Sequence, residues 1–402
     1  MSPICCCLPR RHSGWYALFL LVLALSCSSQ KDRGGGQSGP GVLHPTEENI
    51  PVITDSRFLL HEEQPAEAKP FLDISGGNRH LIGIMEGSSA EMIGDIADVT
   101  TSKEALYYAD NEYGEVRIYD QLGSLMGTVG SPGLGPGEFQ QPYKLSVTDD
   151  GEILAVLDHG TRVQVFRQQD STYTLEYTFR VPDSFYGGDI CVMNEHVYTL
   201  GLSVTEELDG IIHKYTISGE YVTSFGAIYK TSFELLRRML APEGSLGCNE
   251  KHGVVSHVNN NIPVLTGYTD DGSLIWQVKF ADLNPAKIEE GVTSEGAPSV
   301  TRWSPEKGES MDILLLPNTE DSFLFIYDSI SDFNSLTGIP SGTRHYFNVD
   351  VQTGQGSYLG QNTVIDLYEY PILAALDAER AYTMTFSPFP QFGIYQRKEV
   401  LP

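Results

Sequence analysis

Two stretches of the sequence decide the fold class: ALYYADNEYGEVRIYD at Ala105–Asp120 and LSVTDDGEILAVLDHGTRVQVF at Leu145–Phe166. Both alternate apolar and polar residues in short runs, and the second contains the hairpin signal DG, which together are typical of antiparallel strands. When Asp110 is aligned with Asp158, YYADNEYGEVRIY lies over AVLDHGTRVQVF at a pitch of 48 residues. A repeat of ~40 to 50 residues that contains several strands indicates the blades of a β-propeller.

Expected hairpin turns recur along the chain and predict the number of blades. They lie at Gly123, Ser171, Gly219, Gly272 and Gly354. The longer last step is attributed to loop insertions at Glu289–Pro305 and Ser329–Thr343. Ile372–Arg397 offers strands but no closing hairpin, so the missing outer strand is expected from Leu81–Met85. The prediction is an all-β, six-bladed β-propeller closed by its N- and C-terminal strands, with seven blades as the alternative.

A glycine-rich segment separates the two repeats and reads GSPGLGPGEFQQP at Gly130–Pro142. With its flanking strands it resembles the NHL-type propeller repeat. The larger span Leu81–Pro142 resembles the start of the six-bladed propeller lipoproteins of Gram-negative bacteria. Glycine permits backbone angles closed to other residues and proline stiffens a turn, so we expect a structural role for this loop. Its expected members are Gly135, Pro136, Gly137, Glu138, Phe139 and Pro142, with Phe139 as an apolar wedge between blades.

The first 26 residues differ from the rest of the chain. Arg10 and Arg11 precede the apolar run WYALFLLVLAL at Trp15–Leu25, which is shorter than the ~20 residues that span a membrane. This order predicts a secretory signal peptide at residues 1–26. The sequence ALSC that ends at Cys27 resembles the lipobox of bacterial lipoproteins, which implies lipidation of Cys27. An ordinary signal peptide with a chance cysteine is the alternative.

The residues after Cys27 predict a tether. KDRGGGQSGPG at Lys31–Gly41 cannot pack a core and is typical of a flexible linker. The expected division is a signal peptide at 1–26, a lipidated tether at 27–47 and a propeller at 48–402. No aspartate directly follows Cys27, which by resemblance to Gram-negative lipoproteins favours the outer membrane. One further segment, TSFELLRRML at Thr231–Leu240, has the pattern of a short helix.

Charge and cysteine content limit the partners. The chain has 26 Lys and Arg against 53 Asp and Glu, a net charge of −27, which argues against a nucleic-acid partner and against membrane attachment through basic patches. Membrane contact is therefore expected through the lipid only. Beyond the signal region and Cys27, the cysteines are Cys191 and Cys248. One disulfide and two buried free thiols are both compatible with the sequence.

The sequence contains no common catalytic motif, so no catalytic residue is assigned. Propellers place function at the mouth of the central channel. The candidates there are Asp110, Asp158, His159 and His257. Oxygen ligands from several blades could hold calcium, as in lactonase-like propellers, and histidines could hold zinc, as in amidating-lyase-like propellers. The alternative is that Asp110 and Asp158 cap turns inside their own blades.

Two functions follow from this interpretation. The first is a non-enzymatic, lipid-anchored, extracytoplasmic propeller that binds a protein, a peptide or a glycan and needs no cofactor. The second is a metal-dependent hydrolase or lyase on the same scaffold, with calcium or zinc at the channel mouth. The second requires that three or four Asp, Glu, Asn or His side chains meet at the axis.

Overall fold

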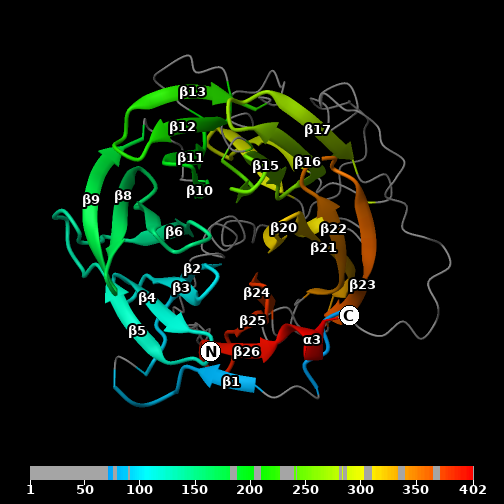
Figure 1. Cartoon of the computed structure of the whole chain (residues 1–402). Coiled ribbons are helices and arrows are strands. Elements are labelled where there is room, and N and C mark those ends of the chain that lie inside the picture. The colour runs from blue at the N-terminus through cyan, green and yellow to red at the C-terminus, as the bar shows by residue number, and fades with distance from the viewer. Residues whose placement is uncertain are drawn as a thin grey trace, which may run out of the picture.

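The chain forms a ring of six four-stranded antiparallel sheets, which confirms the six-bladed β-propeller (Figure 1). The structure is a computed structural model, and it describes residues 71–75, 79–88, 91–181, 188–202, 210–226, 240, 242–279, 283, 288–302, 310–333, 340–364 and 372–401. The expected signal peptide (1–26), tether (27–47) and all of the expected helix except Leu240 lie outside these residues.

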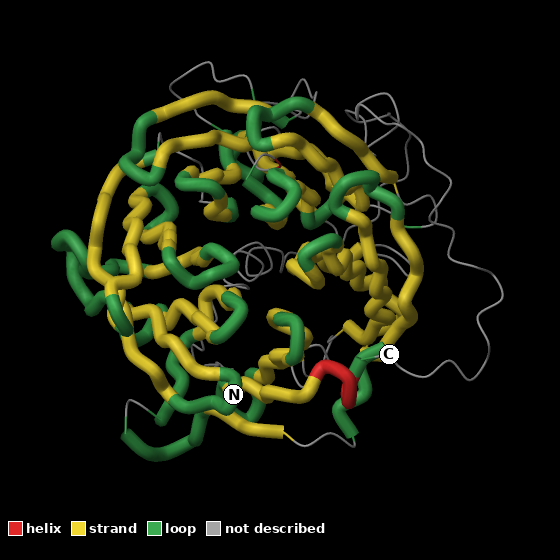
Figure 2. The backbone as a smooth tube through the Cα atoms, viewed as in Figure 1, coloured by secondary structure: helices red, strands yellow, loops and turns green. Residues whose placement is uncertain are grey.

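Each sheet is one blade, and its strands run in order from the axis to the rim (Figures 1 and 2). Blade 1 consists of β2 (Ile96–Thr101), β3 (Ala105–Asp110), β4 (Glu115–Asp120) and β5 (Leu125–Val129). Blade 2 consists of β6 (Pro142–Val147), β7 (Ile153–Asp158), β8 (Arg162–Gln169) and β9 (Thr172–Arg180). Blade 3 consists of β10 (Ile190–Met193), β11 (His196–Leu200), β12 (Ile212–Thr216) and β13 (Tyr221–Phe225). Blades 4 and 5 are built by β14 (Ser245–Asn249), β15 (Val254–Asn259), β16 (Ile262–Thr269) and β17 (Leu274–Lys279); and β20 (Ser310–Thr319), β21 (Ser322–Phe333), β22 (Pro340–Asp350) and β23 (Gly356–Val364).

Blade 6 closes the ring with strands from both ends of the described chain. Its strands are β24 (Ile372–Leu376), β25 (Arg380–Thr385), β26 (Gln391–Gln396) and, outermost, β1 (Arg79–Ile82). β1 pairs antiparallel with β26, so that Leu81 lies opposite Gly393. This pairing confirms that the missing outer strand comes from the N-terminal side. A short helix, α3 (Arg397–Val400), follows β26.

Two segments predicted as loop insertions contain strands instead, so that prediction is wrong in part. Within Glu289–Pro305, β18 (Ile288–Val292) pairs with β19 (Pro298–Arg302) as a separate two-stranded sheet. Within Ser329–Thr343, β21 and β22 continue past the usual blade length and pair Ser329 with Thr343. Both segments contain turn-forming residues, so their sequence does not predict strands. The strands form because they pair with each other through cross-strand hydrogen bonds.

The core lies between the blades. All six residues of β7 are buried. Leu154 and Val156 pack with blade 1, whereas Ile153, Ala155 and Leu157 pack with blade 3. Six such clusters fill the six junctions around the ring. Since burial of one aliphatic side chain contributes about 1.5–3 kcal/mol, every blade depends on both of its neighbours.

The hairpin turns that predicted the blade spacing lock one blade to the next. Gly123, Gly219, Gly272 and Gly354 have φ angles of 83°, 88°, 89° and 67°, a region that favours glycine. A β-carbon added to each glycine would lie against an apolar side chain of the preceding blade: Ile82, Phe179, Phe225 and Trp276, respectively. In blade 2 the turn instead places Asp170 at φ 57°. A β-carbon on these glycines would therefore meet both backbone strain and a neighbouring blade.

The two faces of the ring differ in the length of their connections. On one face, the turn face, strands are joined through two to five residues, as at Asn194–Glu195 and Val351–Gln355. On the opposite face, the loop face, the inner strands begin, and connections reach the lengths of 226–244 and 280–309. Long connections on one side of a rigid scaffold are where propellers and other folds place binding residues.

We expect Gly272→Ala to lower the free energy of unfolding by about 2–4 kcal/mol, because it adds strain at positive φ and a clash with Phe225. The new β-carbon would lie 2.7 Å from that ring. Gly253→Ala is the matched control, since Gly253 has φ 62° and nothing within 4 Å of the position of a β-carbon. Urea unfolding of the control should show a loss of about 1 kcal/mol. Equal losses in the two variants would contradict the interblade lock.

Candidate functional site

Three charged side chains lie between the inner strands where these strands begin on the loop face. Lys144 of β6 lies between Asp98 of β2 and Asp189, the residue before β10. Its Nζ atom is 3.6 Å from Asp98 Oδ1 and 3.8 Å from Asp189 Oδ1. We call these residues the axial triad. They bring together blades 1, 2 and 3, and their side chains are only 12 to 14% exposed.

The triad also supplies hydrogen-bond partners for the backbone of the inner strands. An inner strand has no neighbouring strand on its axial side, so the amides that face the axis need other acceptors. Asp98 Oδ2 accepts from the Leu145 amide at 3.0 Å, and Asp189 Oδ2 accepts from the Leu246 amide of blade 4 at 2.8 Å. Together with the ion pair between Lys144 and Asp189, these bonds connect the inner strands of four consecutive blades.

Burial and charge set the protonation of the triad. Burial raises the pKa of Asp98; Lys144 lowers it and Asp189 raises it further, so that it lies above the ordinary range of an aspartate. Burial lowers the pKa of Lys144, but Asp98 and Asp189 raise it more, so that the ammonium remains charged. The triad is therefore a buried positive charge held by two carboxyl groups, and it keeps a polar centre where these inner strands begin.

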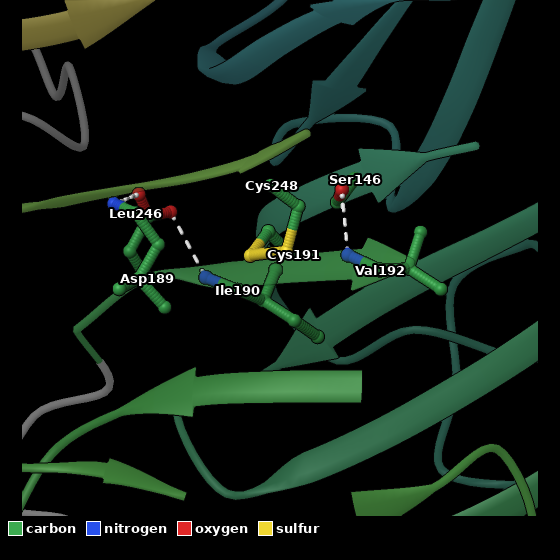
Figure 3. The surroundings of a disulfide bond; sticks show 7 residues. All are labelled: Ser146, Asp189, Ile190, Cys191, Val192, Leu246 and Cys248. Atoms are coloured by element: carbon green, nitrogen blue, oxygen red, sulfur yellow. Dashed lines mark hydrogen bonds between the residues drawn. A yellow bond between two sulfur atoms is a disulfide. The ribbon is translucent and has the colours of Figure 1, made fainter. Parts of the chain in front are cut away.

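A disulfide joins blades 3 and 4 near Asp189 of the triad (Figure 3). Cys191 of β10 is bonded to Cys248 of β14, with a Cα–Cα distance of 5.8 Å. The structure therefore favours one disulfide over two free thiols. The bond closes a sequence separation of 57 residues, for which chain-entropy arguments give a stabilisation on the order of 4 kcal/mol. Disulfides of this kind persist in oxidising compartments.

The two candidate aspartates lie at equivalent ends of β3 and β7, and both are fully buried. Asp110 accepts hydrogen bonds from the amides of Gly94 and Glu112, at 3.0 and 3.1 Å. Asp158 accepts from the Gln141 amide at 2.6 Å and from Arg162 Nε at 2.9 Å. Each carboxylate thus ties the chain that enters an inner strand to another part of the same blade, the turn after β3 for Asp110 and the start of β8 for Asp158.

The two candidate histidines differ from each other in environment. His159 is an exposed turn residue with φ 49°. His257 of β15 is buried, and burial lowers its pKa to about 4, a hydrogen bond with the Glu243 backbone acting in the opposite direction. Its Nε2 atom has no hydrogen-bond partner. His257 is therefore neutral at neutral pH.

The four candidates do not form a ligand set. Asp158 and His159 are neighbours in sequence, but the bonds of Asp110 and Asp158 stay within separate blades. The described part of the chain contains no group of three or more His, Cys, Asp or Glu side chains placed to hold a metal ion. The geometry therefore gives no support to calcium or zinc at these residues.

The glycine-rich loop lies on the loop face between β5 and β6. Phe139 is 1% exposed and packs among residues of blades 1 and 2, in the position expected for the wedge. The Glu138 carboxylate accepts from the Gly135 amide at 2.8 Å, and the Gly137 amide donates to Gln164 Oε1 at 2.8 Å. The first bond lies within the loop, and the second holds the loop against blade 2.

Sequence reasoning missed the axial triad. One signal was available: Lys144 is a charged residue inside the otherwise largely apolar strand PYKLSV. Asp98 and Asp189 carried no comparable signal, because their meeting depends on the order of blades around the axis.

Comparison with known proteins agrees with the fold. A family model described as a 6-bladed beta-propeller, DUF5128, matches residues 85–209, which contain blades 1 and 2 and the inner half of blade 3. Among curated proteins, none matches this chain.

Several solved structures are similar over most of the chain. A DUF4221 member from Bacteroides vulgatus is 9% identical, with coverage of 79% of this chain and 96% of that chain and a TM-score of 0.49. A Bacteroides fragilis protein assigned as exported is 10% identical, with coverage of 77% and 84% and a TM-score of 0.47. The Cps50 (Swd1) propeller domain of Myceliophteria thermophila is 10% identical, with coverage of 79% and 99% and a TM-score of 0.42. At these identities and TM-scores, the similarities carry no argument about function.

We expect acid to destabilise the protein partly through His257. Its pKa of about 4 in the folded protein lies below the ordinary histidine value of 6.5, so the unfolded chain binds a proton first as the pH falls. Stability is therefore lost as the pH falls from about 6.5 towards 4, and by linkage this loss reaches about 2 kcal/mol at pH 5.

Urea unfolding at pH 7.5 and pH 5 measures this loss. His257→Gln should reduce the difference in unfolding free energy between the two pH values by about 2 kcal/mol. His159→Gln, which changes an exposed histidine on the same face, should leave it unchanged. An undiminished acid loss in His257→Gln would refute the assignment.

Proposed function

We propose that the protein is an extracytoplasmic binding module that is held to a membrane by a lipid on Cys27 and receives its ligand on the loop face. The fold supports a general interaction module. The observation that carries the choice of face is the asymmetry of the ring: connections on the turn face have two to five residues, whereas those between blades on the loop face reach the lengths of 226–244 and 280–309.

The geometry of the loop face supports a ligand that is recognised by surface contact. The triad and the buried aspartates hold the beginnings of the inner strands rigidly, so the connections start from fixed points. A rigid base lowers the entropy that is lost when a ligand orders the contacts above it. A protein, a peptide or a glycan would fit such a face, and the net charge of −27 favours cationic or neutral partners.

The location is supported by two independent features. The Cys191–Cys248 disulfide suits an oxidising compartment, and the beginning of the chain has the order of a lipoprotein signal. Cys27 is directly followed by Ser28 and not by an aspartate, which favours the outer membrane of a Gram-negative bacterium. Within the described ranges, no helix is long and apolar enough to cross a membrane.

A photo-crosslinking amino acid at Glu112 is expected to capture the ligand, whereas the same amino acid at Glu104 is not. Both glutamates are exposed in turns of blade 1, Glu112 on the loop face and Glu104 on the turn face. Crosslinking in cells that carry the full-length chain, followed by mass spectrometry of the adducts, makes the comparison. Adducts confined to position 104 would show that the ligand binds the turn face and would contradict the proposal.

Cys27→Ser is expected to abolish incorporation of an alkyne-labelled fatty acid and to release the protein from the membrane fraction, because the thiol that carries the lipid is lost. Cys7→Ser is the matched control, since Cys7 precedes the apolar run, and labelling should persist in it. Labelling and membrane retention of the Cys27→Ser variant would refute the anchor.

A further inference from the structure

Five residues that precede β1 pack against the junction of blades 5 and 6 without belonging to a strand. They are residues 71–75, which we call the strap. Phe71 is 5% exposed and Leu72 is 1% exposed. Both side chains belong to the apolar cluster that includes Tyr346 of β22 and Tyr395 of β26. The strap therefore contributes to the core of a different junction from the one that contains Ile82 of β1.

The first residues of the strap are bound to the outermost strand of blade 5. The Leu72 amide donates to Asn362 Oδ1 of β23 at 3.0 Å, and Asn362 Nδ2 donates to the Leu72 carbonyl at 2.9 Å. The Phe71 amide donates to the Gln361 carbonyl at 3.3 Å, and the rings of Phe71 and Tyr346 have centroids 4.2 Å apart. Asn362 is 2% exposed, so its amide holds both backbone groups of Leu72 where water cannot replace the bonds.

The next residue of the strap is bound to the chain that follows blade 6. The Asp73 amide donates to the Val400 carbonyl of α3 at 2.9 Å. Val400 is 2% exposed and lies in the same apolar cluster as Phe71 and Leu72. Since α3 directly follows β26, the strap connects the outermost strand of blade 5 to the end of blade 6.

β1 has fewer buried anchors than the strap. Three of its four residues are exposed, and the fourth, Ile82, is buried in the cluster between blades 6 and 1. Just after β1, the Gly83 carbonyl accepts from Gln391 Nε2 at 2.9 Å. The side chains of β1 thus provide one apolar anchor, whereas those of Phe71 and Leu72 provide two. A short outer strand with a single buried anchor is an element that opens locally in a native protein.

We propose that the strap is a second closure of the ring, which holds blades 5 and 6 together while β1 separates locally from β26 and pairs again. Three positions separate the strap from Arg79, so a detached β1 stays at a high effective concentration beside its partner strand. An unpaired strand edge is a template for pairing with another chain. The strap therefore shortens the exposure of the β26 edge and protects the propeller from aggregation.

Hydrogen–deuterium exchange of the full-length protein, resolved to single amides, tests this order of opening. The Leu72 and Asp73 amides should show protection factors at least tenfold higher than those of the β1 amides that bond to β26. Ile82→Ala should accelerate exchange in β1 at least tenfold and leave the strap and β7 unchanged, because the strap does not depend on that anchor. Equal or lower protection of the strap than of β1, or equal acceleration of both in Ile82→Ala, would overturn the proposal.

A strap variant tests whether the strap holds β1 near β26. Asn362→Ala should accelerate exchange in β1 at least fivefold, because a detached β1 then returns more slowly. Asn259→Ala is the matched control and should leave β1 unchanged. Asn259 is fully buried, and its Nδ2 donates to the carbonyls of Leu240 and Glu243, both at 2.9 Å, before blade 4.

Two results of the strap variant would contradict the second closure. Unchanged exchange in β1 would show that the strap does not hold this strand. Equal acceleration in β1 and β7 would show that the ring opens as a whole. The comparison of strap and β1 amides in the unmodified protein decides the question without a variant that could fail to fold.

Discussion

The structure depends on sheets that are apolar on both faces. A blade such as the one containing β7 buries alternate residues against both neighbours, so that no blade can be stable while one side stays open to water. Only a closed ring satisfies this condition for all six. The pairing of β1 with β26 is therefore the step on which the remaining junctions depend, since it completes blade 6 and allows it to pack against blade 1.

Closure of the ring also creates the polar centre. The six inner strands lie around one axis, and their inward amides have no partner strand. Side chains of neighbouring blades accept hydrogen bonds from these amides. Asp98 accepts from the Leu145 amide, Asp189 from the Leu246 amide, and the Ser146 hydroxyl from the Val192 amide. Lys144 compensates the charge of the two carboxylates, and the disulfide reinforces the junction of blades 3 and 4. A rigid centre on the loop face follows from the demand for hydrogen bonds.

The polar side chains at the ends of the second strands of several blades have a structural role. Asp110 and Asp158 stand at the ends of their strands in two blades, and Asn259 holds a similar place in blade 4, where its Oδ1 accepts from the Asn261 amide. Repetition of the same contact in successive blades indicates a part of the blade itself, whereas a binding residue has no reason to repeat. Among the described residues, the axial triad and the difference between the two faces of the ring occur once, and these carry the proposed function.

The sequence by itself determined the fold class, the pitch of the blades and the closure by both termini, because alternation, turn glycines and a missing outer strand are local signals. Gly123, Gly219, Gly272 and Gly354 marked true turns, since positive φ is required there whatever surrounds them. The tertiary structure alone decided that Cys191 bonds to Cys248, that Lys144 lies between Asp98 and Asp189, and that parts of 289–305 and 329–343 form strands. Each of these depends on which distant segments become neighbours around the axis, and no local pattern in the chain encodes that geometry.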